Sequence, residues 1–287
     1  MANTFNTGVH KEDWMTKLQE RLDKPTNWKE VADVIYSENY IINAPYMSTE
    51  FGSQVGTRGT AYGFEDFTLT NDTITVSVKK IAPVFVDRAD MAQIAYVNQM
   101  EIAGRQAKIL NDDIETAMLA DHAAWTDVGD VSGVVTSGNT TQFTVSATNI
   151  DDIVRGIRRI VTVANGTDMM DRNGLFFVWR PADFEALEQF AQANGFNLAD
   201  AALKTGIDAG YHLLGADHYV SNSHAANHVM AGVKRVFQIG ILRTTYGQIV
   251  VTEDPNLQSG TGVIARVDYG VNSPAGLTSI LYDINVV

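Results

Sequence analysis

The spacing of apolar side chains changes along the chain, and each change marks a different expected element. Near the N-terminus, Trp14, Leu18 and Leu22 recur every four positions, which predicts one face of a short helix. A second helical piece follows within "KPTNWKEVADVIYSEN", with Thr26 or Asn27 as its N-cap. Neither piece is long enough to be stable alone. Each must therefore dock on the rest of this chain or on a neighbour.

The next segment loses this helical period. Residues 47–72 are rich in Gly, Ser and Thr, which predicts a long loop or an exposed two-stranded ribbon. A loop of this length usually marks a functional arm. Beyond it, Ile74, Val76 and Val78 alternate with polar residues, the period of a strand, and Pro83 indicates an edge or a break in that strand.

Residues 89–124 predict the longest helix of the chain. Its apolar positions recur at three- and four-residue steps: Ala103, Ala107, Leu110, Ile114 and Met118. The opposite face is polar, with Arg105, Lys108, Asp112 and Glu115. At ~1.5 Å per residue the helix would span roughly 50 Å, which suits a structural strut better than an active-site helix.

The following region changes to helix, strand, helix, an α/β texture. An amphipathic helix is predicted from its apolar positions, with a cap at its start and a glycine at its end: Asn149, Ile150, Ile153, Ile157, Ile160 and Gly166. "GLFFVWR" reads as a buried strand, and Pro181 opens another helix. The remainder, from "GYHLLGADHYVS" onward, predicts mostly strands and turns.

Composition narrows the classes of protein. The chain has 287 residues, of which 45% are hydrophobic and 19% charged, so we expect a sizeable core and no wholesale disorder. It has no apolar run of ~20 residues, so we expect no membrane span. Its N-terminus lacks the basic and apolar regions of a secretory signal. The absence of cysteine excludes disulfides, cysteine-ligated metals and thiol nucleophiles. A net charge of −13 disfavours wrapping of DNA but allows its enclosure.

One short segment suggests a metal site. Residues 212–228, "HLLGADHYVSNSHAANH", hold four of the six histidines, and the possible ligands are His212, Asp217, His218 and His228. On one straight strand His212 and His218 would share a face but lie ~20 Å apart, so only a turn could bring ligands together. The alternative is a hairpin whose two strands and tip carry imidazoles by chance. We favour the hairpin, with no bound metal or cofactor, because no His-Glu-x-x-His pattern is present.

The other motifs in the sequence give weaker evidence for a catalytic or nucleotide-binding site. "GTGVIA", Gly260–Ala265, matches a loose dinucleotide fingerprint, but β-type sequence follows it where a helix is required. No P-loop and no nucleophile elbow is present. The neighbouring carboxylates are expected on solvated helix faces or at a helix N-terminus, and not as acid/base pairs: Asp112, Asp113 and Glu115, and Asp151 and Asp152.

The order of these zones resembles the major capsid proteins of tailed bacteriophages, with the Hong Kong 97-like fold. "TITVSVKKIAPVFVDRADMAQ" is similar to the strand that returns from the extended loop to the spine helix in that family. "EIAGRQAKILNDDIETAMLADHAAW" resembles the spine helix. "GLFFVWRPADFEALEQF" resembles the axial domain's central strand and following helix, and "GVIARVDYGVNSPAGLTSIL" resembles the closing strands of the peripheral domain. The resemblance covers most of the chain from about residue 50.

The resemblance implies an α+β protein with the parts of that fold. They are an N-terminal arm at 1–48, an extended loop at 49–80, a peripheral domain with the spine helix at 81–135, an axial domain at 136–240 and a return to the peripheral domain at 241–287. In that reading the histidine segment is a hairpin of the axial domain, near symmetry copies of itself. Protonation below about pH 6.5 would then weaken this contact.

The function implied is that of a non-enzymatic shell protein. The chain would assemble with itself into hexamers and pentamers of an icosahedral virion capsid, in the host cytoplasm, and enclose double-stranded DNA without reading its sequence. Scaffold, portal and decoration proteins are the further partners implied, and no membrane. We expect assembly contacts from the arm and the ribbon, at Trp14, Leu18, Phe51, Phe64 and Phe67. Two alternatives stay open: an encapsulin-like compartment with an enzyme cargo, and a metal-dependent hydrolase using residues 212–228.

Overall fold

The structure is a computed structural model, and it describes residues 11–47, 58, 69–87, 96–164, 166–194, 211–252 and 260–287. Its α-helices are α1 (Lys11–Leu22), α2 (Asn27–Val31), α4 (Tyr96–Ala120), α5 (Ile150–Val163), α6 (Thr167–Asn173) and α7 (Pro181–Ala193), with short 3-10 helices η1 (Asp121–Ala124) and η2 (Thr278–Ile280). Within these ranges no helix is both long and apolar enough to cross a membrane.

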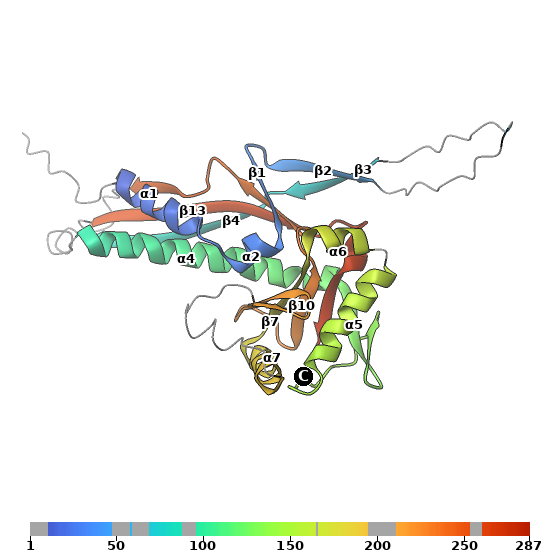
Figure 1. Ribbon diagram of the computed structural model, residues 1–287. Helices are drawn as coiled ribbons and strands as arrows, with labels where there is room; N and C mark the ends of the chain where they lie inside the picture. The colour runs from blue at the N-terminus through green and yellow to red at the C-terminus, as the bar shows by residue number, and fades with distance from the viewer. Residues whose placement is uncertain are drawn as a thin grey trace, which may run out of the picture.

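A five-stranded sheet forms the elongated layer of the molecule (Figure 1). Its members are β1 (Asp33–Ser37), β4 (Val78–Asp87), β11 (Gln238–Leu242), β12 (Gln248–Thr252) and β13 (Gly260–Asn272). The 13-residue β13 is the central strand, with β11 and β12 along one side and β4 along the other. Pro83 accordingly lies on an edge strand, as its missing N–H predicts.

The long helix α4 lies along this sheet, as Figure 1 shows. The five apolar positions expected to face the core, at Ala103, Ala107, Leu110, Ile114 and Met118, are all fully buried, which confirms the helical stripe. Within the described residues the helix has 25 residues, or about 37 Å at the 1.5 Å rise of an α-helix. It is shorter than the expected 50 Å because the chain tightens into η1 after Ala120, while residues 88–95 lie outside the described ranges.

Helix α1 docks on α4 of the same chain. Trp14 donates from Nε1 to Oε1 of Gln106 at 2.9 Å, and Gln106 donates from Nε2 to the carbonyl of Ala82 at 2.7 Å. One buried amide thus joins the N-terminal helix, the long helix and the sheet. Each of these buried polar groups has a partner, which avoids the cost of burying it unpaired.

A seven-stranded sheet forms the second layer, in the order β6-β5-β14-β10-β7-β9-β8. Its strands are β5 (Thr126–Val131), β6 (Val134–Ser137), β7 (Leu175–Trp179), β8 (Tyr211–Leu213), β9 (Ala216–Val220), β10 (His228–Val233) and β14 (Leu281–Asn285). Strand β7 is buried along its whole length, as its uninterrupted apolar run predicts. Helix α5 packs on β6 and β10, and α7 packs on β7 and α5.

The hairpin expected across the histidine segment is wrong. Strands β9 and β10 do not pair, because β7 lies between them, parallel to β9 and antiparallel to β10. The real hairpin joins β8 to β9 through Leu214 and Gly215, both with positive φ. "SNSHAAN" is instead a connection that crosses the end of β7. The segment contains residues typical of a hairpin turn. However, β9 and β10 both pair with the buried strand β7 and not with each other.

The Gly-rich region begins and ends as a two-stranded antiparallel ribbon, β2 (Ile41–Met47) with β3 (Leu69–Thr75). Its base packs on the five-stranded sheet through a small apolar cluster of Ile42, Ile74, Val76 and Leu242. Gly240 in β11 makes room for this contact, since a Cβ there would meet Ile42 Cδ1 at 2.7 Å. From that base the ribbon projects away from both sheets (Figure 1).

Each sheet draws its strands from distant parts of the chain. Strand β14, near the C-terminus, belongs to the seven-stranded sheet. Strands β5 and β6 also lie in the seven-stranded sheet, and β1, from the expected arm, lies in the five-stranded one. The apolar period of a segment predicts that it is a strand. It does not predict which of the two sheets the strand joins, because both sheets bury Val and Ile.

Candidate functional site

The structure separates the histidines of residues 212–228 into different environments. His212 lies at the surface beside Asp217, with Nδ1 2.7 Å from Oδ1 of that carboxylate. Lys234 contacts the second oxygen of Asp217 at 2.5 Å. The pKa of Asp217 is lowered because hydrogen bonds and charge from Lys234 and His212 outweigh the opposing effect of burial. This group is a surface ion-pair network with one imidazole.

His218 lies in the core, with no exposed surface. Trp179 donates from Nε1 to Nδ1 of His218 at 2.9 Å, so Nε2 carries the proton and donates to the carbonyl of Leu213 at 3.0 Å. Burial lowers the pKa of His218 to about 4. Both ring nitrogens are therefore used within the chain, and His218 can neither bind a metal nor reach a symmetry copy. The expected pH-sensitive contact at this residue is wrong for the same reason.

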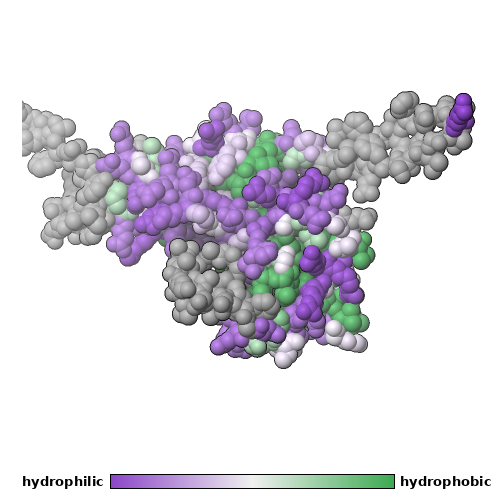
Figure 2. Space-filling model, in the orientation of Figure 1, coloured by the Kyte–Doolittle hydropathy of each residue, from purple (hydrophilic) through white to green (hydrophobic). Residues whose placement is uncertain are grey.

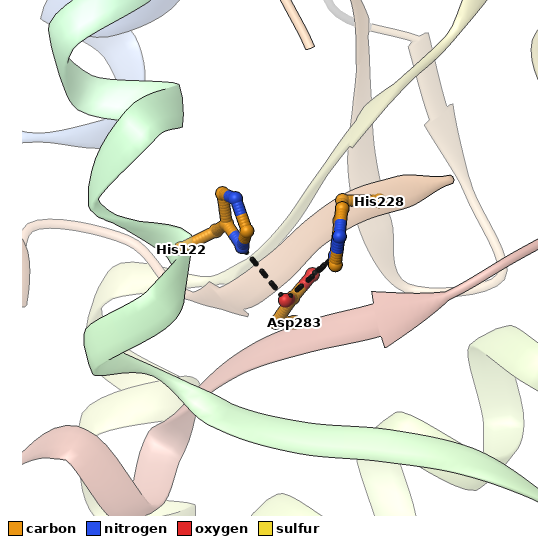
Figure 3. A group of neighbouring side chains, drawn as sticks. All are labelled: His122, His228 and Asp283. Atoms are coloured by element: carbon orange, nitrogen blue, oxygen red, sulfur yellow. Dashed lines mark hydrogen bonds and ion pairs between the residues drawn. The ribbon is translucent and has the colours of Figure 1, made fainter. Parts of the chain in front are cut away.

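His228 belongs to a different group, drawn in Figure 3 with His122 and Asp283. Nδ1 of His228 lies 2.8 Å from Oδ2 of Asp283, and Nδ1 of His122 lies 2.9 Å from the same oxygen. The two imidazole rings are 4.1 Å apart between centroids and inclined by 30°. Within the described ranges, this is the group of three or more His, Asp or Glu side chains whose potential ligand atoms converge, all within 4.8 Å of one another.

Three separate elements supply this group: η1 after the long helix, the start of β10, and the middle of β14. Asp283 pairs across the strands with Met230, two residues beyond His228, so alternation puts His228 and Asp283 diagonally on one face of the sheet. His122 is 161 residues from Asp283 in sequence. His122 and Asp283 were not among the predicted ligands, because no spacing rule connects residues this far apart in sequence.

His224 lies in the connection between β9 and β10 and is partly buried. Its Nε2 atom is buried and has no hydrogen-bond partner in the structure. Burial, with a smaller effect of the positive charge on Arg180, lowers the pKa of His224 to about 4. His224 is therefore a neutral imidazole within electrostatic reach of the other two.

Two of the carboxylates that were expected on solvated helix faces or at a helix N-terminus form ion pairs within the chain. Asp113 pairs with Lys80 of β4 at 3.2 Å, and Asp151 pairs with Arg155 one turn along α5 at 3.0 Å. Residues 260–265 lie within strand β13, which confirms that "GTGVIA" is no dinucleotide loop.

The expected assembly residues fall into two groups. Trp14 and Leu18 are fully buried against this chain's own core, so their side chains leave no surface for a neighbouring subunit. The four-residue spacing identified the buried face of α1 correctly, but the surface it covers belongs to the same chain. Phe51, Phe64 and Phe67 lie outside the described residues.

The five-stranded sheet offers a different surface for contacts. Helix α4 covers one face, where Ala82 and Ala265 are paired and buried. On the opposite face Pro83, Ile264 and Val250 form a row across β4, β13 and β12. Here we call it the outer apolar row. Beside it on β4, Ile81 and Phe85 are 49% and 47% exposed.

More apolar surface lies near the base of the ribbon. Tyr40 and Ile41 are 55% and 61% exposed there, and Figure 2 shows hydrophobic surface over the neighbouring part of the sheet. The surface over α1 and the adjoining part of α4 is mostly hydrophilic in the same view. A groove of about 580 Å³ between these two helices is lined mainly by charged side chains, including Asp13, Lys17 and Glu101.

Comparison with known proteins identifies the fold. No protein-family model matches the chain, and no curated protein matches it. Among solved structures, a chain of Mycobacterium phage Che8 is similar over 86% of this chain and 85% of its own, with 16% identity and a TM-score of 0.58. The capsid of the empty GTA particle matches over 91% and 89%, with 15% identity and a TM-score of 0.60.

A virus-like particle from Pyrococcus furiosus is also similar, over 96% of this chain and 100% of its own, with 11% identity and a TM-score of 0.57. At these identities the likeness establishes the fold alone. The chain therefore has the α+β, Hong Kong 97-like fold expected from the order of its sequence zones.

Proposed function

We propose that this chain is the subunit of a closed icosahedral shell, a major capsid protein that encloses double-stranded DNA. The observation that carries the proposal is the structural likeness along most of the chain, 86% for the chain of Mycobacterium phage Che8 and 91% for the capsid of the empty GTA particle. Function does not follow from fold in general. In this case one matched structure is itself a capsid, and the matches cover most of both chains.

The surface of the chain supports self-association. The outer apolar row and the exposed side chains at the ribbon base leave apolar area uncovered on one face of the five-stranded sheet. Contiguous exposed apolar surface in a soluble protein commonly marks a protein interface. We infer that neighbouring subunits cover this face, and that the ribbon reaches across to them in hexamers and pentamers.

The charge of the chain suits a container for DNA. With a net charge of −13, the protein has little electrostatic attraction for DNA phosphates. Enclosed DNA would therefore stay mobile, and no base sequence would be read. Scaffold, portal and decoration proteins belong to this proposal as further partners, as do assembly in the host cytoplasm and the division of the chain into arm, extended loop, peripheral and axial domains.

The hydrolase alternative loses its basis. It depended on His212, Asp217, His218 and His228 acting at one centre, but only His212 and Asp217 meet, while His218 and His228 lie in two other environments. We therefore propose no catalytic activity. The compartment alternative keeps its basis, because the virus-like particle from Pyrococcus furiosus matches the chain as completely as the phage structures do.

Assembly can be tested with the purified full-length chain. We expect uniform closed shells in negative-stain electron microscopy and a single large species in analytical ultracentrifugation. A monodisperse monomer or dimer across salt, pH and protein concentration would contradict the proposal. Particles isolated from the natural source then separate the two kinds of container: nuclease-protected double-stranded DNA supports a capsid, whereas a co-purifying enzyme without DNA supports a compartment.

A further inference from the structure

We propose that His122, His228 and Asp283 form a binding site for one first-row divalent metal ion, such as Zn²⁺, where the long helix meets the seven-stranded sheet. Two imidazole nitrogens and one carboxylate are ligands that zinc and its neighbours favour, whereas Ca²⁺ and Mg²⁺ prefer oxygen ligands. The site is independent of residues 212–218, and it does not depend on the proposed shell function.

The geometry is close to that of a bound ion. Both Nδ1 atoms already face the same carboxylate, at 2.9 Å for His122 and 2.8 Å for His228. Ligands ~2.1 Å from a tetrahedral ion lie roughly 3.4 Å apart, so each imidazole nitrogen must move about 0.5 Å away from the carboxylate oxygen. The three ligand atoms lie within 4.8 Å of one another, and side-chain rotation must also bring the two imidazole nitrogens to this separation.

The surroundings give the site both rigidity and access. The Asp283 side chain is 3% exposed and projects from a strand held on both sides, by β10 and by β5. The side chains of His122 and His228 are 19% and 26% exposed, which leaves a path for the ion from solvent. A fixed carboxylate with two partly exposed imidazoles leaves a further coordination position for water.

A metal ion bound at this site would connect two parts of the fold. His122 belongs to η1, which directly follows α4, while His228 and Asp283 belong to neighbouring strands of the seven-stranded sheet (Figure 3). A bound ion would join the end of the long helix to that sheet with coordinate bonds in place of hydrogen bonds. It would stabilise the folded chain, and the stabilisation would rise with the logarithm of the free metal concentration.

Isothermal titration of the metal-free full-length chain with Zn²⁺ tests the site. We expect one ion per chain, and Co²⁺ should give the visible absorption of a low-coordinate site with nitrogen and oxygen ligands. His122→Gln and His228→Gln each remove one ligand. Each should weaken the affinity by more than the roughly 10- to 100-fold that loss of an outer-shell partner costs.

His212→Gln is the matched control. His212 also pairs its Nδ1 with a carboxylate, at 2.7 Å from Asp217, but no second imidazole joins that pair. This variant should bind Zn²⁺ like the original chain. The proposal is overturned if the original chain binds neither ion, or if His212→Gln loses binding while the other two variants keep it. Because the original chain alone can overturn it, a variant that fails to fold does not obscure the result.

Discussion

At the scale of single residues, His218 shows how the core decides the chemistry of an imidazole. The ring stacks on Phe177, accepts a hydrogen bond from Trp179 and donates one to the carbonyl of Leu213. No acceptor is left for a second proton, and burial lowers the pKa to about 4. An unfolded histidine has a pKa near 6.5. Between about pH 4 and pH 6.5, His218 is therefore protonated in the unfolded chain but neutral in the folded chain.

This difference predicts a loss of stability in acid. The contribution of His218 to the free energy of unfolding is constant above about pH 6.5, falls by about 1.4 kcal/mol per pH unit below it, and levels off near pH 4. Urea unfolding of the unassembled chain, followed by tryptophan fluorescence, measures the slope. His218→Gln should be less stable at pH 7 but should show a shallower slope between pH 6 and 4.5. An equal slope in both proteins would contradict the pKa of His218.

At the scale of elements, helix α5 lies so close to β6 that only glycine fits at the point of contact. Gly156 lies on the buried face of α5, and a Cβ there would overlap the side chain of Val135 in β6. The glycine therefore costs helix propensity, up to about 1 kcal/mol against alanine, in exchange for close packing. Gly104 in α4 is different, since a Cβ there would meet only Arg21, at 3.7 Å from Nε.

The two glycines predict opposite effects of the same substitution. Gly156→Ala should destabilise the chain by about 1–3 kcal/mol, because α5 and β6 must move apart. Gly104→Ala should leave stability unchanged or raise it by up to about 1 kcal/mol, because the space is free and alanine favours the helix. Chemical denaturation at neutral pH compares them. Equal effects of both substitutions would show that the approach of α5 to β6 is not limiting.

At the scale of the whole molecule, the two faces of the five-stranded sheet have different roles. One face is filled by α4 and α1, and the other presents the outer apolar row and Phe85. A monomer gains nothing from leaving this apolar surface exposed, whereas the proposed shell would bury it at contacts between subunits.

This difference predicts a separation of folding from assembly. Phe85→Asp and Val250→Asp place a charge on the outer face, where the side chains are 47% and 43% exposed in the single chain. Each should change the free energy of unfolding by less than about 1 kcal/mol but abolish or strongly reduce shell formation. Ultracentrifugation reports the particles, and denaturation reports the fold. Val163→Asp is the control, since Val163 is 79% exposed but lies on α5, away from this face. Normal shells from Phe85→Asp and Val250→Asp would place the contact elsewhere.

Local patterns predicted the elements well where a single period continued for several turns. The stripe of α4, the amphipathic α5, the buried strand β7 and the helix that begins at Pro181 all lie where the sequence indicated. Asn149 stands at the expected N-cap, but its side chain accepts from Ser146 and does not bond the helix amides. A cap position follows from local geometry, whereas the partner of its side chain depends on the preceding turn.

Helix and strand periods are read from neighbouring residues, so the main helices, the α+β class and the order of zones that resembles a capsid protein followed from the sequence. Which strands share a sheet, where α1 docks and which histidines meet depend on the tertiary structure. His122 and Asp283 are 161 residues apart, and they come together because α4 and β14 are placed by burial of their apolar faces. That burial favours apolar surface of any strand alike, so no local pattern specifies the partner.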